Sequence, residues 1–155
     1  MSTIKIAEES DFDGIKSVIS ANRANKDDIY KFPDYFATHR DILRTKYQII
    51  FVTKEGENVI AFLSLHNSDL FRNGSAAEFE IVVHPDCRDR EKHHGEKLLK
   101  HVIRYTNNET KVILLTAKVL KENIPSIRLL QKCGFSCDQD KNDGIGYVMG
   151  LRISR

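Results

Sequence analysis

A cluster of basic residues lies between a predicted strand and a predicted helix, where an anion could bind. Five of its residues could offer charge or hydrogen bonds to a phosphate: Arg88, Arg90, Lys92, His93 and His94. The first N–H groups of a helix have no acceptor within it, and they lie at the positive end of its dipole. Gly95, without a side chain, lets the backbone come close to a ligand. The segment predicts a site for a phosphate-bearing cofactor, and a solvated basic turn is the alternative.

A second segment has the residues that begin and end a helix. Asn123 is a good N-cap, Pro125 falls in the first turn, and Gly134 suits the left-handed residue after the last turn. Helix capping alone explains all three. A functional role would need the side-chain amide of Asn123 to face a ligand, and the local pattern leaves both interpretations open.

Two carboxylates, Glu78 and Glu80, stand two residues apart in a predicted strand. Because side chains alternate across a strand, both lie on one face, and Phe79, Ile81 and Val83 lie on the other. A carboxylate in such a position could accept a proton during catalysis. Alternatively, both could be solvated on a partly exposed strand.

The histidines and cysteines do not form a metal-binding pattern. His84, His93 and His94 lie in one turn, without a carboxylate or cysteine at ligand spacing. The chain also has three cysteines without such spacing, Cys87, Cys133 and Cys137. We therefore expect no metal ion, and we expect the reduced thiols of a cytoplasmic protein.

The composition is typical of one globular domain over residues 1–155. Hydrophobic residues make up 41% of the chain and charged residues 30%. The 24 Lys and Arg residues nearly balance the 22 Asp and Glu residues, and both signs are interleaved along residues 86–92. A nucleic-acid-binding surface needs a more one-sided basic field, so we expect no nucleic-acid partner. No apolar run approaches membrane-spanning length and charges interrupt the amino terminus, so we expect neither membrane association nor a signal peptide.

Hydrophobic periodicity predicts a mixed α/β domain that positions these residues. Apolar runs predict strands over 3–7, 48–53, 59–66, 76–83 and 112–117, and a final hairpin from Phe135 to about Ile153. Apolar residues at helical spacing predict helices after Ser10, around 35–43, over 95–106 and over 124–133. The basic turn thus joins the strand that carries the two carboxylates to the helix that follows it.

Taken in order, these motifs resemble the GCN5-related N-acetyltransferase (GNAT) superfamily, and the resemblance covers essentially the whole chain. Arg90 to Gly95 looks like the family's Arg/Gln-x-x-Gly-x-Gly/Ala turn, followed at the usual offset by Leu98-Leu99. The family's late motif, Asn-x-x-Ala-x-x-x-Tyr-x-x-x-Gly-Phe, looks like the segment with Asn123, Ser126, Leu130, Gly134 and Phe135. Val83-x-Pro85 matches the usual end of the fourth strand.

The resemblance implies a fold and a reaction. The fold would be a mixed, mostly antiparallel sheet with helices on both faces, in the order strand, two helices, three strands, helix, strand, helix and two strands. The reaction would be direct transfer of an acetyl group from acetyl-CoA to an amine of a small molecule, a peptide or a protein. An amine must lose its proton before it attacks, and the family often uses a fourth-strand glutamate, through water, as the base. That role falls on Glu80.

The resemblance also implies the residues that hold acetyl-CoA. A backbone N–H at Val82 or Val83, where the family's fourth strand leaves the fifth, would stabilise the developing oxyanion. The full set of expected cofactor-binding residues is Val82, Val83, Arg88, Arg90, Glu91, Lys92, His93, His94, Gly95, Glu96, Asn123 and Ser126.

Three departures from the family pattern affect these expectations. His93 replaces the first glycine of the turn, and the turn is two residues longer than usual, which favours Arg90 over Arg88 as its opening arginine. Leu130 stands where many members have a tyrosine proposed as general acid. Tyr147, Cys133 or water could take that role, and of the residues Tyr147 is the candidate kept here.

The acceptor is less well defined. Aromatic and acidic residues fall where the family builds its acceptor wall, although helical spacing is equally typical of core: Tyr30, Phe32, Tyr35, Phe36, Asp27, Asp28 and Asp34. The alternative function is a non-catalytic, regulatory acyl-CoA-binding module, which Leu130 and His93 would suit. We expect a monomer or a homodimer.

Overall fold

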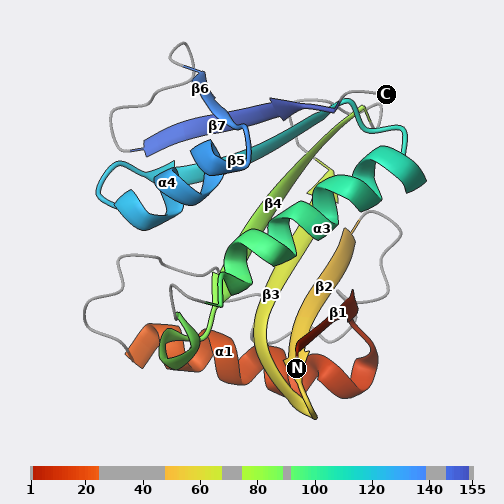
Figure 1. Cartoon of the computed structure of the whole chain (residues 1–155), viewed down its shortest axis with the longest axis vertical. Helices are drawn as coiled ribbons and strands as arrows, with labels where there is room; N and C mark the ends of the chain where they lie inside the picture. The colour runs from red at the N-terminus through yellow and green to blue at the C-terminus, as the bar shows by residue number, and fades with distance from the viewer. Residues whose placement is uncertain (1, 25–47, 68–74, 89–91, 139–145, 154–155) are drawn as a thin grey trace.

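The computed structural model describes residues 2–24, 48–67, 75–88, 92–138 and 146–153. These residues form one seven-stranded sheet with helices on both faces (Figure 1). The strands are β1 (Ser2–Ile6), β2 (Gln48–Glu55), β3 (Asn58–Asn67), β4 (Ala76–Val83), β5 (Leu114–Leu120), β6 (Ser136–Asp138) and β7 (Gly146–Arg152). The helices are α1 (Phe12–Ala24), α3 (His94–Glu109) and α4 (Ile124–Lys132), with single 3-10 turns at Glu9–Asp11 and Pro85–Cys87. The helix predicted around 35–43 lies outside the described residues.

The sheet is mixed and mostly antiparallel, which confirms the predicted fold class. Its strand order is β1-β2-β3-β4-β5-β7-β6. All neighbours are antiparallel except β4 and β5. β5 begins and ends later than the predicted strand 112–117, because its pairing with β7 extends from Leu114↔Arg152 to Leu120↔Gly146.

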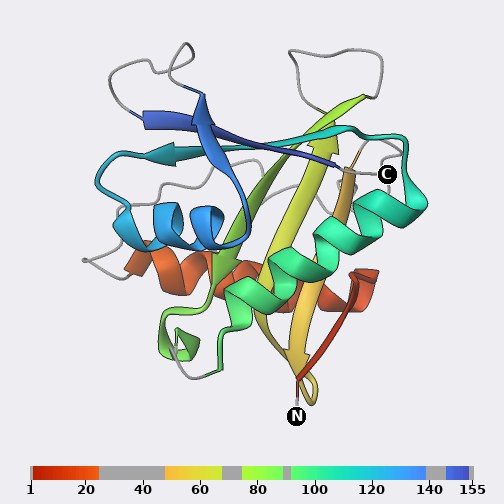
Figure 2. The ribbon, with the colours of Figure 1, turned by 45° about the horizontal axis from the view of Figure 1, so that its top comes forward.

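β4 and β5 pair only at their beginnings and then diverge. Their register comprises three residue pairs and ends at Glu78↔Thr116. Beyond that point β4 remains paired with β3 as far as Val83, and β5 remains paired with β7 as far as Leu120. Figure 2 shows the two ribbons separating toward α4. Each strand therefore has one side without a strand neighbour over its second half.

Two apolar clusters cover the two faces of the sheet, and they settle which way β4 faces. Phe79 packs in one cluster with Leu98 and Leu99 of α3, whereas Val82 packs in the other with Ile15 of α1. The alternation of a strand then places Glu80 on the face opposite to Phe79, as predicted from the sequence, and the clusters identify that face as the one covered by α1.

Candidate functional site

A small cavity lies where β4 and β5 diverge. It is lined by Phe79, Glu80, Ile81, Ala117, Lys118, Val119, Asn123, Ser126, Leu129 and Leu130. These residues come from β4, β5 and the beginning and inner face of α4. The cavity therefore combines a carboxylate, an ammonium group and polar residues of α4 with an apolar wall.

Glu80 brings a half-buried side chain with one buried carboxylate oxygen to this cavity. Its Oε2 atom is buried and has no hydrogen-bond partner in the described part of the chain. Burial and, to a smaller extent, the nearby charge of Glu78 raise the pKa of Glu80, the charge of Lys118 lowers it, and the resulting pKa is about 7. A carboxyl with such a pKa is suited to accept a proton near neutral pH.

Glu78 and Lys118 form an ion pair beside Glu80. The Nζ atom of Lys118 lies 3.7 Å from Oε1 of Glu78, and the two side chains are 75% and 19% exposed. The charge of Lys118 therefore reaches the cavity from its solvent side. Sequence reasoning identified both glutamates but missed Lys118, because nothing local indicates that its strand runs beside theirs.

The backbone of β4 presents alternate N–H groups to the diverging side. The N–H of His84 donates to the carbonyl of Ile60 on β3 at 2.8 Å. Because the β3–β4 register is unbroken, the N–H of Val82 also faces β3, and that of Val83 faces the side where β5 has left. Of the two predicted oxyanion donors, only Val83 has its N–H on this side.

Asn22 and Arg88 hold the end of β4. The side-chain amide of Asn22, which is 1% exposed, donates to the carbonyl of Val83 at 3.2 Å and to that of Val18 at 2.8 Å. Arg88 donates from Nε to the same Val83 carbonyl at 3.3 Å and from its guanidinium to Oδ1 of Asn22. Arg88 is thus bound to α1 and β4. The predicted residues Arg90 and Glu91 lie outside the described residues.

His93 begins α3 in an unusual conformation. It has a φ of 52° and a ψ of 42°, in the left-handed region that favours glycine. This is the position where the family motif expects glycine, so the backbone keeps the glycine conformation with a different residue. The first bond within the helix runs from the N–H of Lys97 to the carbonyl of His93 at 3.0 Å. The N–H groups of the first turn of α3, which includes Gly95, therefore have no acceptor within the helix and point away from it.

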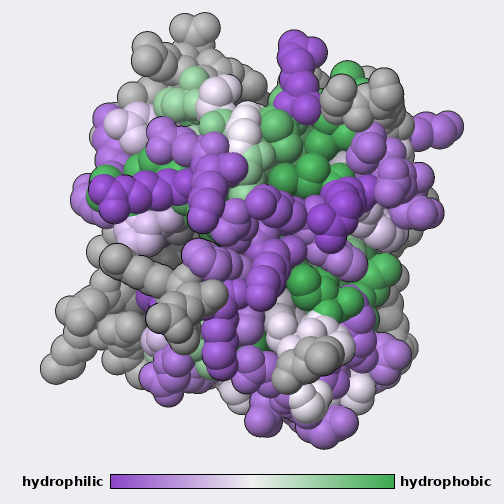
Figure 3. Space-filling model, in the orientation of Figure 1, coloured by the Kyte–Doolittle hydropathy of each residue, from purple (hydrophilic) through white to green (hydrophobic). Residues whose placement is uncertain are grey.

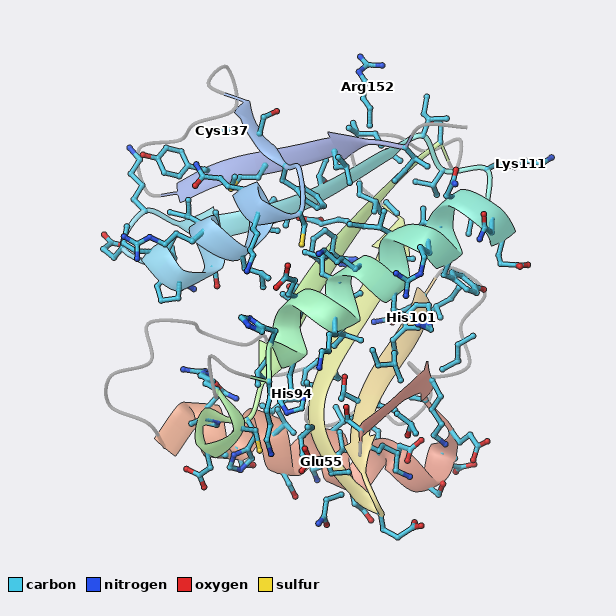
Figure 4. All side chains as sticks on the ribbon, in the orientation of Figure 1. Glu55, His94, His101, Lys111, Cys137 and Arg152 are labelled. Atoms are coloured by element: carbon cyan, nitrogen blue, oxygen red, sulfur yellow. The ribbon has the colours of Figure 1, made fainter. Side chains whose placement is uncertain are left out.

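Glu55 connects the β2–β3 hairpin to the beginning of α3. Its carboxylate lies 3.7 Å from Nζ of Lys92 and 3.6 Å from Nε2 of His94. Figure 4 labels Glu55 and His94 at the same end of the sheet. Both predicted cofactor residues are thus held from a distant strand, which the sequence did not indicate.

Glu96 links α3 to α4 and to the turn before α3. Its carboxylate lies 2.9 Å from Lys100, 3.1 Å from Lys132 and 3.6 Å from Nδ1 of His93. Hydrogen bonds from Lys100 and Lys132 lower the pKa of Glu96. Its described contacts are structural ion pairs.

Gly95 allows the beginning of α3 to pack closely against its neighbours. A Cβ atom added to Gly95 would lie 3.3 Å from Cδ2 of Leu129 and 3.6 Å from Cγ2 of Val83. Packing between elements is therefore one sufficient reason for glycine here, in addition to any ligand.

The α4 residues combine capping with a place in the cavity. Oδ1 of Asn123 accepts the N–H of Ser126 at 3.3 Å, and both residues line the cavity. The two interpretations of Asn123 are thus compatible. Leu130, 3% exposed, contributes an apolar wall at the position of the family's tyrosine. Tyr147 lies on β7 with Nζ of Lys121 5.4 Å from its ring centroid, and it is outside the residues that line the cavity.

Three further features of the described residues are surface hydropathy, helix length and the grouping of possible metal ligands. Figure 3 shows a mostly hydrophilic face with hydrophobic residues confined to separate patches. No helix among the described residues has the length and apolar character needed to span a membrane. Nor do those residues bring together three or more candidate metal ligands.

Comparison with known proteins agrees with this arrangement. The family model described as "Acetyltransferase (GNAT) domain" matches residues 4–150. No curated protein matches the sequence.

Several solved structures share the fold. The structure of yncA from Salmonella typhimurium with acetyl-CoA has 20% identity and a TM-score of 0.77, over 100% of this chain and 95% of that one. PseH, an N-acetyltransferase from Campylobacter jejuni in complex with acetyl-CoA, has 19% identity and a TM-score of 0.71, over 98% and 100%. Mutant forms of the spermidine/spermine N-acetyltransferase SpeG from Vibrio cholerae have 17% identity and a TM-score of 0.71, over 98% and 95%. These identities show a common fold. Because the family model spans nearly the whole sequence, the chain belongs to the GNAT acetyltransferase family.

Proposed function

We propose that this protein transfers an acetyl group from acetyl-CoA to an amine, by direct attack of the amine on the thioester. The observation that carries the proposal is Glu80, whose Oε2 atom is buried and has no hydrogen-bond partner in the described residues, in the cavity between β4 and β5. Family membership supports the acetyl donor. The acceptor is an amine of a small molecule, a peptide or a protein.

The fit of acetyl-CoA rests on two features of this chain. The first-turn amides of α3, from His94 to Glu96, suit a diphosphate, with charge from Lys92 and Arg90. The open side of β4 next to β5 suits the extended pantetheine arm, and Asn123 and Ser126 line the cavity at the reactive end. When bound, acetyl-CoA supplies the activated acetyl group.

Glu80 has the role of general base in this proposal. A lysine-like amine has a pKa near 10.4 and is mostly an ammonium at neutral pH, so it must lose a proton before attack. With a pKa of about 7, roughly half of the Glu80 carboxyls are ionised at neutral pH and can take that proton, directly or through water. The N–H of Val83 is the donor proposed for the developing oxyanion.

Leu130 removes the family's usual acid from the cavity, and the reaction tolerates this loss. A thiol has a pKa of about 8.5, so a thiolate can leave without being protonated first. Tyr147 stays a proposed substitute for the tyrosine, although it does not line the cavity. A missing acid costs roughly 10²–10⁴-fold at most.

Binding and transfer are tested separately. Calorimetry with acetyl-CoA measures binding, and thiol release measures transfer to a panel of small amines, polyamines and peptides. We expect Glu80→Gln to bind acetyl-CoA as the wild type does and to lower kcat by roughly 10²–10⁴-fold. The control is Glu57→Gln, an exposed glutamate in the β2–β3 turn, which should change neither quantity.

Leu130 and His93 also favour a second candidate, a regulatory module that binds acyl-CoA without transferring the acyl group. Tight acetyl-CoA binding, with thiol release indifferent to Glu80→Gln and to every acceptor, would support this module and contradict catalysis. Absence of binding to any acyl-CoA would contradict both. A cytoplasmic location, a monomeric or homodimeric state and the lack of a nucleic-acid or membrane partner stay predictions from the sequence.

A further inference from the structure

Lys118 is the structural counterpart of Glu80 on the other diverging strand. The last pair between β4 and β5 is Glu78↔Thr116, so Lys118 lies as far beyond that pair on β5 as Glu80 does on β4. Alternation places both side chains on the face opposite to Phe79 and Ala117, which pack with α3. Lys118 and Glu80 both line the cavity.

The amine of Lys118 is exposed at this cavity and is held there by a single described ion pair. Its side chain is 75% exposed, and its ammonium lies 3.7 Å from Glu78 without being enclosed. A lysine carries its charge on a flexible four-carbon stem with three rotatable donors. Among the described lysines, Lys118 is the one that lines the cavity. It thus places a primary amine in the space that the proposed function assigns to the acceptor.

We propose that Lys118 is a self-acetylation site: in the absence of an acceptor, its amine takes the acetyl group that acetyl-CoA brings to the cavity. This inference rests on the proposed function. The Lys118 nitrogen forms a C–N bond with the acetyl carbonyl carbon, and the C–S bond of the thioester breaks. The Lys118 ammonium loses one proton to Glu80 or water before the attack and a second proton as the amide forms. The second proton passes to water or to the departing sulfur, so coenzyme A leaves as thiolate or thiol.

Acetylation of Lys118 would change the cavity in two ways. The neutral amide would lose its ion pair with Glu78, which would leave the two β4 glutamates without the cation that now faces them. The added acetyl group would also occupy acceptor space beside Glu80. Self-acetylation would therefore reduce transfer to an external amine, and an abundant acceptor would protect Lys118.

The test follows acetylation of Lys118 directly. Purified protein is incubated with acetyl-CoA labelled with heavy carbon, without an acceptor, and the labelled lysines are identified by peptide mass spectrometry. We expect label on Lys118, with a rate constant that does not change when the protein is diluted. Glu80→Gln should slow the labelling by at least about 100-fold. Unlabelled acetyl already present on wild-type Lys118 and missing from Glu80→Gln counts as the same result.

Lys121 and Lys132 are the internal controls, because they lie near the same strand and helix but do not line the cavity. Lys118→Arg keeps the positive charge beside Glu78 and should carry no label at residue 118 or elsewhere in the cavity. Labelling of Lys118 at the same rate as Lys121, or at an unchanged rate in Glu80→Gln, would show uncatalysed chemistry and overturn the inference.

Failure of the inference is distinguishable from failure of the proposed function. A Lys118 that carries no acetyl group, heavy or light, in a protein that binds acetyl-CoA and acetylates an external amine would overturn self-acetylation alone. A protein that binds no acetyl-CoA in calorimetry would overturn the proposed function and this inference with it.

Discussion

Glu80 makes opposite contributions to activity and to stability. Its proposed role requires the ionised carboxylate, whereas burial and the neighbouring charge of Glu78 favour the neutral acid, and its pKa is raised from 4.5 to about 7. The folded protein therefore binds a proton more tightly at this residue than the unfolded chain does. Between these two pH values, the free energy of unfolding must fall as pH rises.

Because ionisation of Glu80 lowers the free energy of unfolding, Glu80→Gln should differ from the wild type in how its stability depends on pH. The amide cannot ionise, so the variant lacks the loss of stability that the wild type undergoes between about pH 4.5 and 7, up to about 3 kcal/mol. Thermal or urea unfolding should show that the stability of the variant, relative to that of the wild type, increases from pH 4.5 to 8. The activity of the variant should be lost over the whole range. A difference between the two proteins that does not change with pH would contradict the assigned protonation.

His93 allows the left-handed conformation at the beginning of α3 to be tested. Both His93→Gly and His93→Ala remove the imidazole and its contact with Glu96, so a comparison of the two isolates the backbone. At a φ of 52° we expect the glycine variant to be more stable than the alanine variant by about 1 kcal/mol. Urea unfolding measures the difference. Equal stabilities would mean that the turn relaxes to another conformation.

At the residue scale, the sequence identified side chains that depend on local pattern and missed those that depend on long-range contacts. Alternation along β4 was enough to predict that Glu78 and Glu80 lie on the face opposite to Phe79. Glu55 and Asn22 could not be found in this way, because each reaches the site from an element far away in the chain. Lys118 belongs with them, since its role depends on β5 lying beside β4.

At the element scale, β7 holds β5 in place while β4 departs from it. Gly150 of β7 pairs with Thr116, the last residue of β5 that also pairs with β4. Gly146 of β7 pairs with Leu120 at the end of β5. β5 keeps this partner along its whole length. Pairing with β7 therefore determines the course of β5 beside the cavity.

The two glycines of β7 are predicted to differ in their tolerance of a side chain. A Cβ atom at Gly146 would lie 2.5 Å from the backbone oxygen of Val119, whereas at Gly150 the nearest atom would lie 3.5 Å away. Gly146→Ala must separate β7 from β5, and we expect a loss of about 1–3 kcal/mol. Gly150→Ala is the matched control and should change stability by less. Chemical denaturation of both variants checks this, and equal losses would contradict the pairing described.

The order and types of the described elements follow the sequence prediction closely, because each has a clear hydrophobic period and clear end signals. The bounds of β5 were predicted less well. A continuous apolar run does not indicate where a strand loses one neighbour and keeps the other. For the same reason, the divergence of β4 and β5 came only from the resemblance.

At the scale of the whole molecule, Asp11 joins the amino-terminal strand to the hairpin that follows in the sheet. Its carboxylate, 2% exposed, lies 3.1 Å from Nζ of Lys5 on β1 and 2.8 Å from Nζ of Lys54 on β2. It also accepts the N–H of Glu8 at 2.9 Å. Burial alone would raise the pKa of Asp11, but these hydrogen bonds outweigh it and lower the pKa below its ordinary 3.8.

The lowered pKa of Asp11 predicts how the molecule responds to acid. The stabilisation is complete above the ordinary pKa and is lost as pH falls through the lower value in the fold. We expect Asp11→Asn to cost about 1.5–3 kcal/mol at neutral pH and progressively less as pH falls below 3.8. Thermal unfolding across this range measures the change. Asp13→Asn, an exposed residue at the beginning of α1, is the control, and a pH-independent loss in Asp11→Asn would contradict the assignment.

The one-sided pairing of β4 also has a consequence for isotope exchange in the resting protein. The amides of Glu80 and Val82 are engaged with β3, whereas those of Ile81 and Val83 face the side that β5 has left. The backbone amides of β4 should therefore exchange with deuterium in an alternating pattern, fast at the odd-numbered residues and slow at the even-numbered ones. A bound pantetheine arm that pairs with β4 would slow exchange at the odd-numbered residues and remove the alternation. Amide-resolved spectra would measure these rates residue by residue.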